Sequence, residues 1–372
     1  MAGVRKVGVE EELLLVDPET GELANAAGHV LHEHRSERHD VPPPTASHDL
    51  EGELLRHMIE THTDPVTDLG DVARQLRQAR RTALAAAEES GFALVAVGTA
   101  PLGSAEPAVS ANPRYERIAN EFGDTGRGAG TLGMHVHVDI EDEDEGVRVI
   151  DGLRPWLPLL TAISANSPYA SGKDTGYASW RQQVMTRWPT AGPAEPYGSA
   201  AEYHRVSRAL IGIGAALDAG MLYFDARLSA KFPTVEVRVA DTCTEVDDAL
   251  VVIALARALV QTFAEADPPD RPWRVDLLRG AWWRSARYGL SGHLVHPVTA
   301  ETVGAREAVE ALREVVDDAL QAAGDAELVD ERLTRLSTTG TGSRRQRAAY
   351  ERTGELRGVV ADLVSRTAES VR

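Results

Sequence analysis

The sequence has one cysteine, Cys243, among 372 residues, which excludes an intramolecular disulfide and a metal site built from cysteines. It also lacks any run of about 18 uninterrupted apolar residues. Its N-terminus leads directly into an acidic segment and contains no apolar signal core. We therefore expect a cytoplasmic protein that does not interact with a membrane.

Positive charge is scarce as well. The chain carries 57 Asp and Glu residues against 39 Lys and Arg residues, which gives a formal net charge of −18. An acidic surface repels nucleic acid phosphates and anionic lipids. We therefore expect small molecules as binding partners, and neither nucleic acid nor a membrane.

Predicted strands are spread over the chain among predicted helices. Hydrophobic patterning and turn residues predict strands at 6–16, 92–97, 132–140 and 235–240. Helical periodicity predicts helices near 66–90, 145–165, 200–217, 246–266, 305–323 and 344–370. Loops are predicted at 25–48, 101–131 and 166–199, and the last is long enough to form a lid or a binding wall. We expect one α+β domain over residues 1–372, because no linker divides the chain.

Three of these strands place ionisable side chains on a single face. Side chains alternate between the two faces of a strand, so residues two apart point the same way. The residues that share a face in this way are Glu10 and Glu12 in one strand, His135, His137 and Asp139 in another, and Glu236 and Arg238 in a third. Any one of these strands is also compatible with a polar face in water. Three together favour a common functional surface.

Such a surface predicts a metal site. Two like charges about 4 Å apart repel by roughly 4 kcal/mol at an effective dielectric of about 20, and divalent ions with oxygen ligands remove that cost. Glutamates with one or two histidines suit Mg²⁺ or Mn²⁺ better than Zn²⁺. Zinc hydrolases also use His-x-His on a strand, so a metal-dependent amide hydrolase is the alternative. The downstream histidines (His204, His293 and His296) do not lie in a strand-like alternation.

Three other features allow more than one interpretation. Glu53 and Glu60 lie seven residues apart, which puts them on one face of a helix but on opposite faces of a strand, and the spacing alone favours ordinary surface charge. Arg181, next to Trp180, either binds a substrate carboxylate through its guanidinium group or is an exposed loop residue. The segment 340–345 lacks the phosphate-loop pattern, which favours a flexible loop before a helix.

Seven stretches of the chain, in order, resemble the type 2 glutamate–cysteine ligase family, whose members are often called carboxylate–amine ligases. These stretches are Val7–Leu13, Gly133–Val138, Ser164–Tyr169, Asp174–Arg181, Arg187–Pro193, Pro233–Asp241 and Arg284–Leu290. The resemblance implies a glutamine synthetase-like catalytic fold, with a curved, mainly antiparallel sheet flanked by helices. It also implies a homodimer and an ATP-dependent reaction through a γ-glutamyl phosphate.

The same resemblance implies roles for individual residues. The metal-binding pattern of the family falls on Glu10, Glu12, Glu53, Glu60, His135 and Glu236. Arg238 matches the arginine that meets the transferred phosphoryl group, so Arg238 and Glu236 are expected to be catalytic, and Arg238 and His137 to contact the nucleotide. Tyr177, Trp180 and Arg181 are expected to bind substrate. The family's common Gly-Thr-His-Pro-Phe motif is replaced here by residues 98–102, with Ala100 and Leu102 in place of the histidine and the aromatic residue. The identities of the acid and the amine therefore stay open.

Overall fold

An antiparallel sheet forms the centre of the molecule, in a computed structural model that describes residues 3–36, 49–103, 108–128, 130–266 and 273–372. Within these residues the sheet has seven strands in the order β2-β3-β1-β5-β9-β8, with β4 pairing separately with β1. Every pair of neighbouring strands in it is antiparallel. The strands are β1 (Val7–Val16), β2 (Leu50–Gly52), β3 (Met58–His62), β4 (Ala93–Val95), β5 (Gly133–Asp139), β8 (Ala226–Leu228) and β9 (Thr234–Asp241). This confirms the mainly antiparallel sheet that the sequence predicts.

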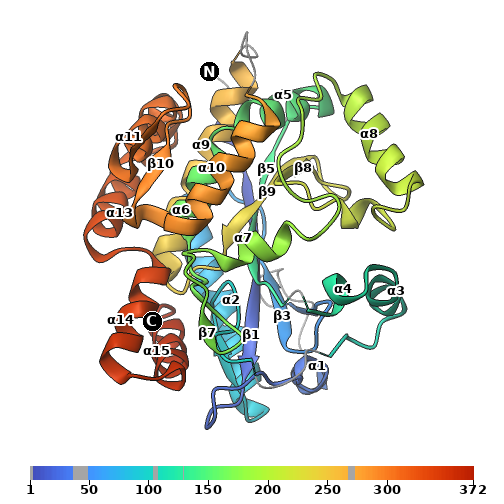
Figure 1. The fold of residues 1–372 in the computed structure, drawn as a ribbon, viewed down its shortest axis with the longest axis vertical. Coiled ribbons are helices and arrows are strands. Elements are labelled where there is room, and N and C mark those ends of the chain that lie inside the picture. Colours follow the sequence, from blue (N-terminus) through green and yellow to red (C-terminus); the bar gives the residue numbers. More distant parts are fainter. Residues whose placement is uncertain (1–2, 37–48, 104–107, 129, 267–272) are drawn as a thin grey trace.

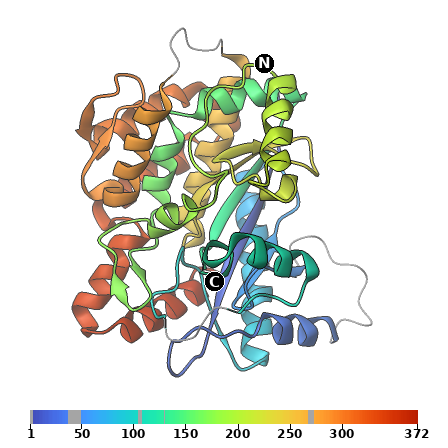
Figure 2. The same ribbon diagram turned by 45° about the vertical axis from the view of Figure 1, so that its right-hand side comes forward.

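Helices surround this sheet. They are α1 (Ala27–Ser36), α2 (Leu69–Glu89), α3 (Pro113–Phe122), α4 (Asp124–Gly128), α5 (Glu143–Leu153), α6 (Leu157–Ser164), α7 (Trp180–Met185), α8 (Ala200–Gly212), α9 (Val246–Glu265), α10 (Val275–Tyr288), α11 (Ala305–Val315), α12 (Asp317–Ala323), α13 (Ala326–Thr339), α14 (Gly342–Thr353) and α15 (Leu356–Glu369). Figures 1 and 2 show the C-terminal helices on one side of the sheet, and α3, α4 and α8 on the other. Two small hairpins, β6 (Tyr169–Ala170) with β7 (Lys173–Asp174) and β10 (His293–Val295) with β11 (Thr302–Gly304), lie outside the sheet. None of the helices in the described parts of the chain is both long and apolar enough to cross a membrane.

The apolar face of the sheet packs against α2, α5, α6 and α9. It buries the valines of β5 and β9 completely or nearly so, including Val136, Val138, Val235 and Val237. α9 is apolar around most of its circumference, and 15 of its residues are buried, because it lies between this face and further helices. The opposite face of the same strands is therefore the one left for polar side chains.

The predicted loops contain more regular structure than expected. Helix α1 lies in the predicted loop 25–48, of which residues 37–48 fall outside the described parts of the chain. Helices α3 and α4 lie in the predicted loop 101–131, and α7 with the β6–β7 hairpin lies in 166–199. Asn112 caps α3 by accepting the Arg114 N–H, and Pro113 occupies the first turn. An N-cap residue followed by proline is a sequence signal for the start of a helix. The helix was not predicted because its apolar pattern is short.

Several predicted helices are each two helices in the structure. In the predicted helix 145–165, Pro155 and Pro158 predict a bend, and the structure divides it there into α5 and α6, because a proline removes a backbone donor and disrupts the helical turn. Likewise 305–323 is α11 and α12, and 344–370 is α14 and α15. α14 and α15 are separated at Gly354, whose φ of +76° is a left-handed conformation that favours glycine.

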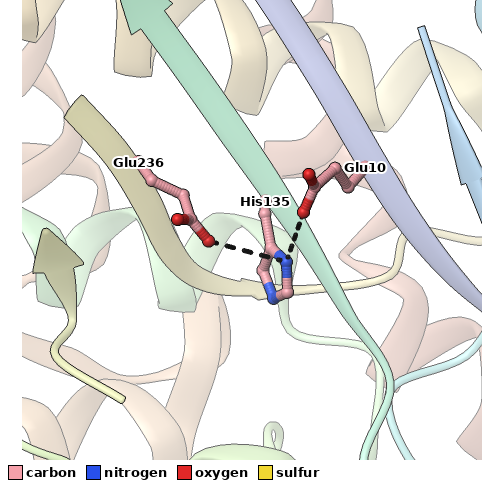
Figure 3. A group of neighbouring side chains, drawn as sticks. All are labelled: Glu10, His135 and Glu236. Carbon is pink, nitrogen blue, oxygen red and sulfur yellow. Dashed lines mark hydrogen bonds and ion pairs between the residues drawn. The ribbon is translucent and has the colours of Figure 1, made fainter. Parts of the chain in front are cut away.

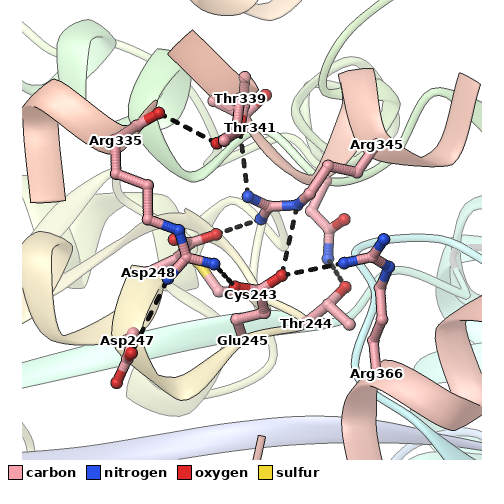
Figure 4. Close-up of polar contacts among 12 residues, drawn as sticks. Cys243, Thr244, Glu245, Asp247, Asp248, Arg335, Thr339, Thr341, Arg345 and Arg366 are labelled. Atoms are coloured by element: carbon pink, nitrogen blue, oxygen red, sulfur yellow. Dashed lines mark hydrogen bonds and ion pairs between the residues drawn. The ribbon is translucent and has the colours of Figure 1, made fainter. Parts of the chain in front are cut away.

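The connection from α13 into α14, at residues 340–345, is held firmly and is not a flexible loop. Thr341 and Ser343 are buried, and Arg345 donates hydrogen bonds to Asp248 and to the Gly340 carbonyl. Figure 4 shows the arginines of α13, α14 and α15 converging on carboxylates at the start of α9. Arg345 is therefore occupied by protein carboxylates, and this segment ties the C-terminal helices to α9.

Glu11 points to the helix-covered face of β1, as the alternation predicts, and is paired there with Arg80 of α2. Both side chains are fully buried, and the guanidinium donates to the two carboxylate oxygens over 2.7 and 2.8 Å. Arg80 also donates to the carbonyls of Cys243 and Thr244, each at 2.7 Å. All the strong polar groups of this pair are thus satisfied inside the core.

Replacing Arg80 by alanine should strongly destabilise the protein. Removing one partner leaves the Glu11 carboxylate buried without a counter-charge, which costs about 3–5 kcal/mol in the free energy of unfolding. Urea denaturation monitored by circular dichroism measures this loss. The control is Arg74→Ala, which removes an exposed i,i+3 pair with Asp71 and should cost less than about 1 kcal/mol. Equal effects of the two substitutions would contradict the structural role of the buried pair.

Candidate active site

Strand register brings the predicted acidic residues together. In the antiparallel pairing of β1 with β5, Glu10 lies directly opposite His135. In the pairing of β1 with β3, Glu12 lies directly opposite Glu60. Directly opposed residues of neighbouring strands have their side chains on the same face. Four residues from three distant parts of the sequence therefore share one surface.

β9 adds Glu236 to this surface with the help of an irregularity. The pairing of β5 with β9 shifts register between Met134 and Val136, which is a β-bulge beside His135. His135 Nδ1 lies 3.3 Å from Glu10 Oε2 and 4.0 Å from Glu236 Oε1. Figure 3 shows the imidazole between the two carboxylates, with β1, β5 and β9 each contributing one side chain. One ligand atom from each of these three residues lies within 4.8 Å of the others, as a shared metal ion requires.

A second group of possible ligands consists of Glu12, Glu60 and His135, also within 4.8 Å of one another. Glu53 lies beside them, immediately after β2, where its carboxylate accepts the Leu54 N–H at 2.8 Å. The hairpin of β2 and β3 thus resolves the question left by the spacing of Glu53 and Glu60. They belong neither to one helix nor to one strand, and the chain reversal brings them to the same place.

The carboxylates of this second group repel one another. Burial, followed by the nearby charge of Glu53, raises the pKa of Glu12 to about 7. Burial and the charges of Glu53 and Glu10 raise the pKa of Glu60 well above its ordinary value. A bound cation would stabilise the ionised form of such carboxylates most strongly. The donor set of several glutamate oxygens and an imidazole therefore fits Mg²⁺ or Mn²⁺.

Glu236 has the opposite environment. Arg227 on β8 donates to both of its oxygens, at 2.7 and 3.1 Å, and Arg238 donates to Oε1. Burial alone would raise the pKa of Glu236, but Arg238 and Arg227 hold it well below the ordinary value. Arg227 was not among the predicted site residues, although it stands between the buried Ala226 and Leu228 in an alternating strand. Its strand is too short for the pattern alone to identify it.

The two histidines differ in their partners. Burial and then the charge of Arg238 lower the pKa of His135 to about 4, so its ring is neutral and able to act as a ligand. His137 Nε2 lies 3.3 Å from Glu10 Oε1, and its Nδ1 lies 3.0 Å from the Thr234 hydroxyl. Asp139, the third residue of this predicted face, lies at the end of β5, where its backbone carbonyl accepts from Arg5.

Arg181 reaches the same region from α7 and is buried, which excludes the exposed loop arginine considered above. Its Nη2 donates to the Arg238 carbonyl at 3.0 Å, while its Nε is buried without a hydrogen-bond partner. A Cβ at Gly133 would lie 2.2 Å from Arg181 Nη2, so only glycine permits this approach. A buried guanidinium with an unused donor is suited to a substrate carboxylate or phosphate.

Asp241 at the end of β9 positions α7. Its Oδ2 accepts the Asn166 N–H at 2.8 Å and the Ser167 hydroxyl at 2.6 Å, and its Oδ1 accepts the Ser179 hydroxyl at 2.8 Å. Ser179 is the N-cap of α7 and accepts the Gln182 N–H. One buried carboxylate therefore fixes both ends of the segment 166–179 and the start of the helix that carries Arg181.

The other two predicted substrate residues form an aromatic pair. The rings of Tyr177 and Trp180 lie 5.3 Å apart, centroid to centroid. The Tyr177 hydroxyl accepts from Trp283 Nε1 at 3.3 Å, and the Arg287 guanidinium lies over the Tyr177 ring. This pair therefore joins the segment before α7 to α10, and its substrate role stays a prediction.

Comparison with known proteins identifies the family. The glutamate-cysteine ligase family 2 (GCS2) matches residues 6–364. The chain belongs to this family. A protein of Nocardioides sp. that is provisionally named glutamate–cysteine ligase 2-1 is 52% identical over 371 residues, covering 99% of this chain and 97% of the relative. One from Streptomyces avermitilis with the same provisional name is 45% identical over 369 residues, covering 98% of this chain and 99% of the relative.

Solved structures show the same fold at low identity. A bifunctional glutathione synthetase from Pasteurella multocida superposes with a TM-score of 0.70 at 16% identity over 98% of this chain, which spans 52% of that longer enzyme. A glutamate–cysteine ligase from Francisella tularensis, in complex with AMP, superposes with a TM-score of 0.64 at 13% identity, over 100% of this chain and 89% of that one. The family name describes a ligase that forms a C–N bond, which confirms the predicted enzyme class. The relatives give no support to the amide hydrolase alternative.

The raised pKa of Glu12 predicts that Mg²⁺ stabilises the protein more at pH 8 than at pH 6. A carboxyl whose pKa rises on folding holds its proton below about pH 7, so in the metal-free protein it destabilises the fold increasingly as pH rises from its unfolded value of 4.5 through 7. Mg²⁺ must displace that proton at pH 6 but not at pH 8. Calorimetric melting temperatures with and without MgCl₂ measure the difference, and Glu12→Gln should remove much of it. An identical shift at both pH values would contradict the assignment.

Proposed function

We propose that this protein is an ATP-dependent carboxylate–amine ligase that phosphorylates a carboxylate and joins the acyl phosphate to an amine. Glutamate–cysteine ligation, or formation of a related γ-glutamyl amide, is the specific reaction proposed. The observation that carries the proposal is the convergence of Glu10, His135 and Glu236 with Arg238 on one face of an antiparallel sheet. We also propose that this sheet is of the glutamine synthetase type.

Phosphorylation of a carboxylate would explain why the site contains both acidic and basic side chains. A carboxylate is a poor electrophile, and transfer of a phosphoryl group to it creates a mixed anhydride with a good leaving group. Phosphoryl transfer depends mainly on positioning and on neutralising charge. Mg²⁺, when bound, supplies that neutralisation at the phosphate oxygens. The proposed ligands are Glu10, Glu12, Glu53, Glu60, His135 and Glu236.

The arginines have separate proposed roles. Arg238 would stabilise the transferred phosphoryl group, since its guanidinium lies within 3.4 Å of His135 Nδ1, at the edge of the proposed metal site. Arg227 holds Glu236 as a carboxylate and restrains it. Arg181 would bind the carboxylate of the acid substrate through its guanidinium group. His137, beside Glu10, is the proposed nucleotide contact on β5, and Tyr177 and Trp180 are the proposed substrate wall.

A hydroxylamine assay tests the acyl phosphate directly. Hydroxylamine is neutral at pH 7 and attacks acyl phosphates without help, releasing phosphate and leaving a hydroxamate. With ATP, Mg²⁺ and a panel of amino acids that includes glutamate, the protein should form a hydroxamate with at least one acid and release ADP in equal amount. Omitting ATP should abolish the product. Metal-dependent amide cleavage without ATP, and no hydroxamate with any acid, would overturn the proposal.

Glu236→Gln should lower ATP turnover by at least about 100-fold, the scale expected when a charged group at a phosphoryl-transfer site is lost. The amide keeps the size of the side chain but neither holds a divalent ion as well nor pairs bidentately with Arg227. Coupled ADP release measures the effect, and circular dichroism verifies the fold. The matched control is Glu310→Gln, at an exposed residue paired with Arg306, which should leave turnover unchanged. Full activity of the Glu236 variant would refute its catalytic role.

Two further expectations belong with this function and stay predictions. A homodimer is proposed from the family resemblance, and sedimentation velocity measures it. Cytoplasmic location is proposed from the sequence, and fractionation of cells that express the protein tests it.

A further inference from the structure

The imidazole of His62 lies among three carboxylates at the outer side of the metal-binding face. Its Nε2 is 3.9 Å from Glu51 Oε1 and 3.9 Å from Glu60 Oε2, and its Nδ1 is 3.9 Å from Glu10 Oε1. Neither His62 nor Glu51 belongs to the ligand set proposed above. The three strands β1, β2 and β3 each contribute to this group.

None of these three contacts is a hydrogen bond. A nitrogen–oxygen distance of 3.9 Å is too long for one. His62 Nε2 is nevertheless buried and has no hydrogen-bond partner, although two carboxylate oxygens face it.

The spacing is that of ligands around an ion. Two ligand atoms at about 2.0–2.2 Å from one metal ion can be up to about 4.4 Å apart, so separations of 3.9 Å leave room for an ion between them. Glu51, Glu60 and His62 each offer one such atom, and all three atoms lie within 4.8 Å of one another. Small rotations of the exposed Glu51 side chain would complete the geometry.

Backbone pairing holds the three residues in place. Glu51 lies directly opposite Glu60 in the β2–β3 pairing, and His62 follows Glu60 by two residues on β3, so all three share a face. His62 is also directly opposite Glu10 in the β1–β3 pairing. Glu10 therefore faces the ring from its Nδ1 side, at 3.9 Å.

We propose that Glu51, Glu60 and His62 form a separate site for a divalent transition metal such as Zn²⁺ or Mn²⁺. One imidazole nitrogen and two carboxylate oxygens are ligands that both of these ions accept. Glu51 keeps 62% of its side chain exposed, so an ion can enter from solvent. Glu60 belongs to both this site and the proposed Mg²⁺ ligands, so occupation by Zn²⁺ should compete with Mg²⁺.

Zn²⁺ binding to the complete, chelator-treated protein tests this proposal without ATP or substrate. Equilibrium dialysis with metal analysis should show a tight Zn²⁺ ion in the wild type whose affinity is at least tenfold weaker in His62→Ala and in Glu51→Gln. Glu236→Gln, which alters only the Glu10–His135–Glu236 group, should keep the tight ion. Co²⁺ absorption provides a second readout, because loss of an imidazole ligand changes the visible band.

The chain provides a matched control in the exposed pair His29 and Glu33, whose nitrogen and oxygen also lie 3.9 Å apart. That pair is part of no three-ligand cluster in the described residues, so His29→Ala should leave the affinity for Zn²⁺ unchanged. Circular dichroism verifies the fold of each variant. Equal Zn²⁺ affinity in the wild type and in His62→Ala would overturn the proposal.

A kinetic consequence separates this inference from the proposed ligase activity. Zn²⁺ should inhibit Mg²⁺-dependent ADP release by the wild type, and His62→Ala should require at least tenfold more Zn²⁺ for the same inhibition. Zn²⁺ binding that depends on His62 in a protein without ligase activity would refute only the ligase. Ligase activity with Zn²⁺ binding indifferent to His62 would refute only the second site.

Discussion

Repulsion among glutamates on one face of an antiparallel sheet is the constraint on which the site depends. Direct cross-strand pairing places Glu12 opposite Glu60 and Glu10 opposite His135, so the backbone holds the side chains together whatever their charges prefer. The raised pKa values of Glu12 and Glu60 record the cost of that arrangement. We have proposed that cations bind here, and their binding would recover that cost.

The two faces of β1 differ in how their charged side chains are paired. Glu11 points among the helices, and Arg80 neutralises it permanently with two short hydrogen bonds. Glu10 and Glu12, its neighbours in sequence, point to the other face and have no comparable guanidinium clamp. On that face the arginines gather at β8 and β9, where Arg227 and Arg238 hold Glu236. The site is therefore polarised, with an excess of carboxylate at β1–β3 and an excess of guanidinium at β8–β9. Such an arrangement suits a cation-bound polyphosphate that needs both ions and arginines.

Sequence patterns predicted the ligand-type residues of this site better than the residues that contact them. Alternation along a strand is a local property, so Glu10, Glu12, His135 and Glu236 could be assigned to faces from spacing alone. Pairing between strands is not local, and the residues that depend on it were missed: Arg227 comes from a three-residue strand, and His62 faces Glu10 and Glu51 only because β3 pairs with both β1 and β2. Asp241 was missed for the same reason, because its role comes from distant partners in 166–179. Helical periodicity did not predict short helices such as α1 and α3, because few of their residues are buried.

Residues 98–103 contact the segment 166–172. Ala100 and Leu102, where the family resemblance implies a histidine and an aromatic residue, pack against a core cluster and not among the carboxylates. Their segment is hydrogen-bonded to residues 166–172: the Thr99 hydroxyl donates to the Tyr169 carbonyl, and Gly172 donates its N–H to the Pro101 carbonyl. A Cβ at Gly103 would lie 2.5 Å from the Ser171 Cα, so the two segments are in direct contact. Ala100 and Leu102 therefore lie in a segment that contacts 166–172, whereas the pairing of β5 with β1 and with β9 gathers Glu10, His135 and Glu236.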